Sequence, residues 1–156
     1  MSAPGSKSSE PVSRPPQVAA AALALAVFMA DQASKAALLY GLDLKSDPRV
    51  IEITAFFNLV MVWNRGVSFG LFQADGGGRW PLIGLSAAIL IILILWLRRL
   101  ERRLPAYAIG LIIGGAVGNV VDRVVYGAVA DFFDLHIAGY HWYAFNIADS
   151  AIVIGV

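Results

Sequence analysis

The chain has 156 residues, of which 58% are hydrophobic and 15% are charged, and its formal net charge is +1. Soluble domains contain about 45–50% apolar and about 25% charged residues, so this composition predicts an integral membrane protein and argues against a soluble domain. The net charge gives no sign of nucleic-acid binding, and no segment combines basic and aromatic residues as such binding would require.

The first 16 residues are rich in Ser, Pro and Gly, and we expect residues 1–16 to form a disordered cytoplasmic tail. We do not expect a signal peptide here, because the apolar run that follows is long and contains Asp31 and Lys35. We expect residues 17–156 to form a single membrane domain whose first span covers about 18–42. Asp31 and Lys35 lie four apart with the acid first, which favours a helical ion pair. The pair is either structural or in contact with substrate or catalytic groups.

The sequence of the segment after this span is not typical of a membrane helix. Residues 43–78 begin with a turn-rich stretch and continue with β-branched and aromatic residues, so we expect a small sheet at the membrane surface. Gly66 and Gly70 suit bends or close backbone contacts, and residues 75–78 are typical of a flexible turn. Asn64 lies at the expected bend, and sequence alone favours a turn residue there.

The second span is predicted at about residues 80–97, and it opens with Trp80 and Pro81 as a helix start at the interface does. Four arginines follow in a very short loop: Arg98, Arg99, Arg102 and Arg103. Because cytoplasmic loops carry an excess of positive residues, we expect this loop and the N-terminus in the cytoplasm.

The third span is predicted at about residues 104–121. Gly110, Gly114 and Gly118 recur every four residues, a spacing that lets another helix approach closely. We expect this face to serve internal packing, although it would also suit dimerisation. Residues 124–143 are rich in aromatic residues, which indicates a second piece outside the hydrocarbon region.

A fourth span is predicted at about residues 144–156. Only about a dozen residues remain there, whereas a crossing needs about 20, so we expect this helix to be partial in the given sequence. With the arginine loop inside, the end of the third span and the start of the fourth lie outside. The unusual polar residues then gather at one membrane face: Asp31, Lys35, Asn64, Asp122, Asp131 and Asp149.

Carboxylates in a membrane segment are costly and usually functional. The pattern Asn-x-x-Asp occurs at Asn119/Asp122 and at Asn146/Asp149, with Asp131 between them. No Gly-x-Ser-x-Gly or His-Glu-x-x-His is present, there is no cysteine, and two histidines are too few for a histidine-rich metal cluster. What remains is a pair of carboxylates that share a proton, one as general base and one as general acid. The alternative is that these Asp residues cap helices or pair with arginine, most plainly for Asp122.

Five segments carry a resemblance to a known family: ADQASK at 30–35, NRGVSFG at 64–70, GGAVGNVVDR at 114–123, VADFFD at 129–134 and FNIADS at 145–150. In this order and spacing the chain resembles the lipoprotein signal peptidases, the signal peptidase II family. The resemblance implies an all-α membrane fold of four transmembrane helices with a small extracytoplasmic β-cradle, here about residues 43–78 and 124–143. It also implies a multi-pass protein of the bacterial cytoplasmic (inner) membrane with its active site at the outer-leaflet face.

The activity implied is that of an aspartic endopeptidase, which removes the signal peptide of diacylglyceryl-modified prolipoproteins by cutting before the lipidated Cys. The resemblance assigns the catalytic pair to Asp131 and Asp149. Its expected substrate-binding residues are Asn64, Asn119, Arg123 and Asn146. Its further polar residues are Asp31, Lys35 and Asp122, the last as the structural partner of Arg123. It implies no metal or cofactor, and it implies lipid-modified precursors and membrane lipids as partners of a monomer.

The residues alone leave two other hypotheses for the function open. A small transporter or proton channel would also use Asp and Lys in a membrane, although transporters more often show repeated halves with broken helices. A non-catalytic assembly subunit would use the glycine face of the third span.

Overall fold

The structure is a computed structural model, and it describes residues 15–66 and 79–156. The predicted tail lies almost wholly outside these residues, as do Gly70 and the predicted turn at 75–78. The helices are α1 (Pro16–Ala36), continued by a π-helical turn η1 (Ala37–Gly41), α2 (Arg79–Leu97), α3 (Arg103–Tyr126) and α4 (Ile147–Gly155). The strands are β1 (Ile51–Thr54), β2 (Phe57–Asn64), β3 (Val129–Ile137) and β4 (Tyr140–His141).

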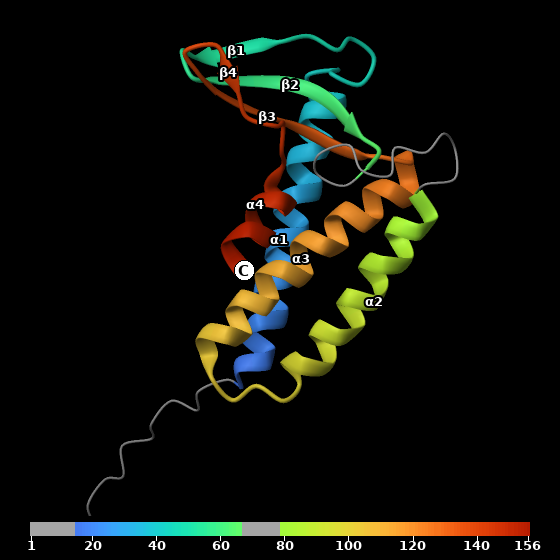
Figure 1. The fold of residues 1–156 in the computed structure, drawn as a ribbon, viewed down its shortest axis with the longest axis vertical. Helices are drawn as coiled ribbons and strands as arrows, with labels where there is room; N and C mark the ends of the chain where they lie inside the picture. The colour runs from blue at the N-terminus through green and yellow to red at the C-terminus, as the bar shows by residue number, and fades with distance from the viewer. Residues whose placement is uncertain (1–14, 67–78) are drawn as a thin grey trace, which may run out of the picture.

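Three helices in the described part of the chain are long and apolar enough to cross a membrane, and they span Pro16–Gly41, Arg79–Leu97 and Arg103–Tyr126. Figure 1 shows these helices running side by side, with the four strands gathered at one end of the bundle. These helices agree with the membrane protein predicted from the composition, and the small sheet agrees with the one predicted from the β-branched and aromatic residues of 43–78. The helix α4 has nine described residues, so the fourth span stays a prediction.

The third helix is longer than predicted, because α3 ends at Tyr126 rather than near Val121. Its polar residues Asp122 and Arg123 stay helical because both have partners inside the protein. The helix ends at Gly127, which has a φ of 78° and donates its backbone N–H to the carbonyl of Arg123. Glycine tolerates this left-handed conformation without the steric cost that other residues would carry.

Helix α3 is the centre of the bundle and packs against α1, α2 and α4. A Cβ on Gly110 would lie 2.6 Å from the carbonyl oxygen of Ala20, and one on Gly114 would lie 2.5 Å from that of Ala24. The glycine spacing thus lets the backbones of α3 and α1 touch. The prediction that this face serves internal packing is confirmed.

The sheet is antiparallel in the order β1–β2–β3–β4. Strand β3 is its most buried member, and Ala130 and Phe132 in it have no exposed surface. The register pairs Asn64 with Val129 and Val62 with Asp131, with an irregularity between Leu59 and Val62. Because β3 follows α3 after a short turn and α4 follows β4, the sheet connects the ends of these two helices (Figure 1).

Candidate active site

Asp131 lies near the start of β3 and is only 2% exposed. Its two carboxylate oxygens have different partners on two other elements. Nδ2 of Asn64 donates to Oδ2 at 3.0 Å, and Nδ2 of Asn146 donates to Oδ1 at 2.7 Å. A buried carboxylate held by one donor on each oxygen has a fixed orientation, which is a requirement for acid–base chemistry.

Asn64 has two roles in this arrangement. Its Oδ1 accepts a hydrogen bond of 3.1 Å from the backbone N–H of Gly66, as an asparagine in a turn does. Its amide nitrogen is then free to face Asp131. The turn residue predicted from the sequence and the site residue implied by the resemblance are therefore compatible.

Asp149 lies in the first turn of α4, where it forms a capping box with Asn146. Its backbone N–H donates to Oδ1 of Asn146 at 2.9 Å, and its Oδ2 accepts from the backbone N–H of Asn146 at 3.2 Å. Its Oδ1 accepts a hydrogen bond of 2.8 Å from Nδ2 of Asn119 on α3. A capping box satisfies two backbone donors at a helix start, so the local fold of α4 places this carboxylate.

Asn146 connects the two carboxylates. It has no exposed surface, and its amide nitrogen lies 2.7 Å from Oδ1 of Asp131 and 3.3 Å from Oδ1 of Asn119. Its side-chain oxygen meanwhile accepts from the backbone of Asp149. Asp131 on β3 and Asp149 on α4 thus belong to one hydrogen-bond network, although they lie on different elements.

The environment changes the acidity of Asp131. Burial, and after it the negative charge of Asp149, raise the pKa of Asp131 to about 7, although hydrogen bonds from Asn64 and Asn146 act in the opposite direction. A carboxyl group with a pKa near neutrality can both accept and donate a proton at physiological pH.

Asp31, Lys35 and Asp122 form a second polar cluster inside the bundle. The Lys35 ammonium lies 2.7 Å from Oδ2 of Asp31 and 2.8 Å from Oδ2 of Asp122, and all three side chains are almost fully buried. The predicted Asp31–Lys35 helical ion pair is confirmed. Among the described residues Asp122 pairs with Lys35 and not with Arg123, so that part of the expectation is wrong. Neighbouring residues on a helix point in different directions, which lets Asp122 face α1 while Arg123 faces elsewhere.

The Arg123 guanidinium turns toward the end of β2. Its Nη2 donates to the carbonyl of Gly66 at 3.2 Å, and its Nη1 donates to the carbonyl of Asn119 at 3.4 Å. Its buried Nε has no hydrogen-bond partner in the described part of the chain. The four expected substrate-binding residues are thus linked to the two carboxylates directly or through one backbone contact.

Sequence reasoning missed one member of the buried cluster, Gln32. Its Nε2 donates to Oδ2 of Asp31 at 3.1 Å and to Oδ1 of Asp122 at 3.2 Å. The signal that could have found it is a second polar residue directly after Asp31 in an otherwise apolar span.

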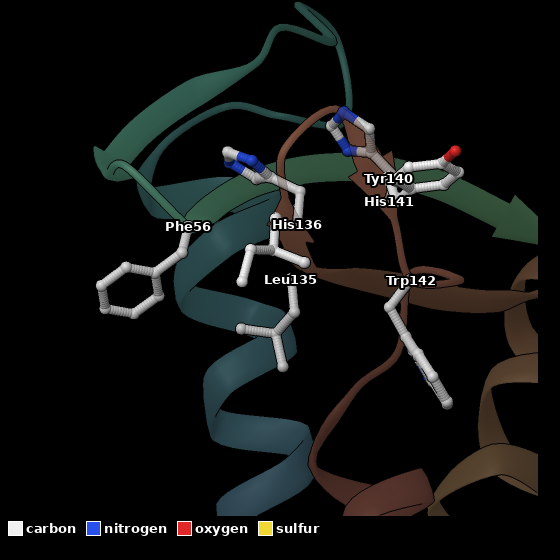
Figure 2. A pocket seen from close by; sticks show the side chains of 7 residues that line it. Phe56, Leu135, His136, Tyr140, His141 and Trp142 are labelled. Atoms are coloured by element: carbon white, nitrogen blue, oxygen red, sulfur yellow. The ribbon is translucent and has the colours of Figure 1, made fainter.

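An apolar hollow of about 440 Å³ lies at the far end of the sheet, apart from Asp131 and Asp149. Figure 2 shows Leu135 and Trp142 extending from the sheet toward the side on which α4 lies, with the rings of His136 and His141 above them. The two imidazoles stack with centroids 4.9 Å apart. No group of three or more potential metal ligands occurs in residues 15–66 and 79–156.

The sequence matches the family model of signal peptidase (SPase) II over residues 23–156. It is 53% identical over 133 residues to a lipoprotein signal peptidase of Methylorubrum extorquens, covering 85% of this chain and 77% of that protein. It is 52% identical over 136 residues to a lipoprotein signal peptidase of Methylobacterium radiotolerans, covering 86% of this chain and 78% of that one.

Two solved structures described as bacterial membrane enzymes have similar folds. One has a TM-score of 0.76 at 29% identity and covers 88% of this chain and 82% of its own, and the other has a TM-score of 0.74 at 28% identity, with 88% and 87% covered. The family match extends over nearly all of the described membrane helices and strands, including both carboxylates and their asparagine partners. The chain belongs to the signal peptidase II family, whose members are lipoprotein signal peptidases.

Proposed function

We propose that this protein is an aspartic endopeptidase that removes the signal peptide from diacylglyceryl-modified prolipoproteins, cutting before the lipidated Cys, with Asp131 and Asp149 as its catalytic pair. The observation that carries the proposal is the position of Asn146, which donates to Asp131 and also caps the helix turn that holds Asp149. Membership of a peptidase family supports the reaction class, and the buried, oriented carboxylates support the aspartic mechanism.

The proposed reaction needs one proton shared between the two carboxylates. The ionised member takes a proton from water while the water oxygen attacks the scissile carbonyl carbon. The protonated member donates a hydrogen bond to the carbonyl oxygen and stabilises the negative charge that develops there. When the carbon–nitrogen bond breaks, a carboxyl proton goes to the leaving amine, which is the new N-terminus of the lipidated Cys. The pair is then ready for the next water.

The raised pKa of Asp131 supports this division of roles. A pKa of about 7 means that Asp131 can gain or lose a proton near physiological pH. Two interacting carboxylates titrate as a unit, so the proton is assigned to the pair and not to one residue.

The substrate side of the proposal rests on the residues around the pair. Asn64 and Arg123 meet at the turn of Gly66, and Asn119 contacts Asp149, so polar groups surround the carboxylates from β2 and α3. We propose that they bind the peptide backbone and the lipidated Cys at the outer-leaflet face of a bacterial inner membrane. The proposed enzyme works as a monomer with four spans, without metal or cofactor, on precursors that reach it through the lipid.

The test is cleavage by the purified, detergent-solubilised protein. A synthetic or cell-derived prolipoprotein carrying the diacylglyceryl group should shift to a smaller species on a gel, and mass spectrometry should find the lipidated Cys at the new N-terminus. The same precursor without the lipid is the matched control and should be cleaved poorly. Cleavage that is equal with and without lipid, or that falls at another bond, would contradict the proposed specificity.

A further inference from the structure

The buried cluster of Asp31, Lys35 and Asp122 has a symmetry that a simple ion pair would lack. One ammonium group lies between two carboxylates, at 2.7 Å from the first and 2.8 Å from the second. The first carboxylate belongs to α1 and the second to α3. The neutral side chain of Gln32 also connects the two carboxylates, because its amide nitrogen donates to both of them.

Each carboxylate also accepts a backbone hydrogen bond, and the two donors are residues next to the proposed catalytic carboxylates. Oδ1 of Asp31 accepts from the backbone N–H of Ala148 at 3.0 Å. Oδ2 of Asp122 accepts from the backbone N–H of Ala130 at 3.1 Å. Ala148 directly precedes Asp149, and Ala130 directly precedes Asp131.

We propose that Asp31, Lys35 and Asp122 are a positioning triad, which sets the separation of the two catalytic carboxylates by holding the backbone immediately before each of them. This inference rests on the proposed function of Asp131 and Asp149. The triad links four elements, since its own residues lie on α1 and α3 and its backbone donors lie on β3 and α4. Asp131 and Asp149 lie on separate elements, β3 and α4, so the distance between their carboxylates depends on contacts that hold both elements against the same helices.

The lysine is the residue on which this arrangement depends. Two buried carboxylates close together repel each other, and the ammonium group between them offsets that repulsion. The Lys35 ammonium also lies 3.5 Å from Oδ1 of Asn119, whose amide donates to Asp149. Loss of the cation would therefore weaken the hydrogen bonds from Ala148 to Asp31 and from Ala130 to Asp122. It would disturb the catalytic pair through the backbone and through Asn119.

The surrounding chain is shaped to admit the triad. A Cβ on Gly118 would lie 2.5 Å from Oδ2 of Asp31 and 3.5 Å from the Cβ of Ala148. Glycine at this position leaves room for the Asp31 carboxylate to reach across to α4. The close packing leaves the Asp31 carboxylate little room to move, as expected for a group that positions others.

The test compares Lys35→Met with the parent by steady-state kinetics on the diacylglyceryl precursor. Methionine keeps most of the side-chain volume and removes the cation. Because misplacement of reacting groups by about 1 Å can cost about 10²-fold in rate, we expect kcat to fall on the order of 10- to 100-fold. KM should change much less than kcat, because among the described residues Asn119 is the one proposed binding residue that hydrogen-bonds to the triad, whereas Asn64, Arg123 and Asn146 do not.

The pH profile separates positioning from general structural support. Among the described residues, the charged groups around Lys35 and the catalytic pair are Asp31 on α1, Asp122 and Arg123 on α3, Asp131 on β3 and Asp149 on α4. The lysine charge favours the ionised form of Asp131. The rising limb of the kcat–pH profile should therefore move to higher pH in Lys35→Met, a shift that a loss of folded protein alone would not produce.

Asp31→Asn provides a second variant if Lys35→Met does not fold in detergent. Its side-chain oxygen can still accept from Ala148, but its link to Lys35 is lost, so kcat should fall with KM unchanged and by less than in Asp31→Leu. Asp134→Asn is the matched control, a buried carboxylate on β3 that contacts Asn58 and His141 outside the triad. Its kcat should be that of the parent.

The outcomes separate the two proposals. Folded Lys35→Met or Asp31→Asn with the kcat and pH profile of the parent would overturn the triad, and so would equal changes in Asp31→Asn and Asp31→Leu. Asp131→Asn and Asp149→Asn are run in the same assay. If these two variants cleave normally, the proposed catalytic pair itself is wrong.

Discussion

The side chain of Asn146 donates a 2.7 Å hydrogen bond to Asp131 while its own oxygen accepts the backbone N–H of Asp149. One asparagine therefore acts both as the N-cap of α4 and as the bridge between the two proposed catalytic carboxylates. These two roles can be separated by substitution, because capping needs only a side-chain acceptor, whereas the bridge needs a donor of the right reach.

Asn146→Ser should keep the helix cap and lose the bridge. Serine is a good N-cap, whereas alanine at an N-cap costs about 0.5–2 kcal/mol. Asn146→Ala should therefore unfold at a lower temperature than Asn146→Ser in detergent, while both variants lose most cleavage activity. If Asn146→Ser cleaves the lipidated precursor as fast as the parent, the bridge to Asp131 has no catalytic importance.

Gly118→Ala should destabilise the protein and lower its activity. The new Cβ would lie 2.5 Å from Oδ2 of Asp31, so the carboxylate or the helix must move. Overpacking of this kind costs about 1–3 kcal/mol. Gly84→Ala is the matched control, because Gly84 lies in α2 and a Cβ there meets nothing within 4 Å. Thermal unfolding should show a loss for Gly118→Ala and no loss for Gly84→Ala, and equal unfolding temperatures would contradict the packing argument.

The general plan of the site could be predicted from the sequence. The positive-inside rule, applied to the arginine loop, predicted that Asp31, Asp131 and Asp149 lie at the same end of the bundle. In the structure all three lie there and belong to one connected network of hydrogen bonds. The internal use of the glycine spacing on α3 was also predictable, because small residues four apart let two helix backbones meet.

The partners of each residue could not be predicted in the same way. Adjacency in the sequence suggested that Asp122 pairs with Arg123, but the helix turns them to different neighbours, Lys35 and Gly66. Such contacts depend on how α1 packs against α3, and periodicity within one helix carries no information on that packing. The same reason explains why Gln32 was missed, since its significance lies in a contact between two helices.

Protein stability should depend on pH through Asp131. Burial and the charge of Asp149 raise the pKa of Asp131 to about 7, whereas the pKa of an Asp in the unfolded chain is about 4. The folded protein then binds a proton more tightly than the unfolded chain, so the stability that the protonated group contributes is present below about pH 4 and is lost as pH rises to about 7.

The unfolding temperature of the parent in detergent should therefore fall more between about pH 5 and about pH 8 than that of Asp131→Asn, which has no titrating group there. Differential scanning fluorimetry at the two pH values measures this difference. An identical pH dependence in parent and variant would mean that Asp131 titrates in its ordinary range.

Membrane topology can be tested by labelling, because the chain has no native cysteine. Ser46 follows the first span and Glu101 lies between α2 and α3, and both are exposed. In intact bacterial cells, Ser46→Cys should react with a membrane-impermeant maleimide, and Glu101→Cys should react only after the membrane is opened. The reverse pattern would place the sheet and the catalytic pair on the cytoplasmic side.

The identity of the catalytic pair can be decided with four isosteric variants. Asp131→Asn and Asp149→Asn each remove one titrating group from a reaction that needs both a base and an acid, so each should lose at least about 10²-fold in kcat. Precursor binding should largely survive, because Asn64 and Arg123 are unchanged. Asp134→Asn lies on the same strand as Asp131, but its carboxylate contacts Asn58 and His141, and it should stay active.

Asp122→Asn completes the comparison because Asp122 is the other carboxylate with an Asn-x-x-Asp spacing. Its Oδ2 is occupied by the Lys35 ammonium and by the backbone N–H of Ala130, which leaves it poorly placed to take a proton from water. We expect this variant to lose stability and some kcat but to retain measurable turnover. Gel-shift cleavage of the diacylglyceryl precursor by the four purified variants gives the result. A fully inactive but folded Asp122→Asn, together with near-parent activity of Asp131→Asn, would transfer the catalytic role from Asp131 to Asp122.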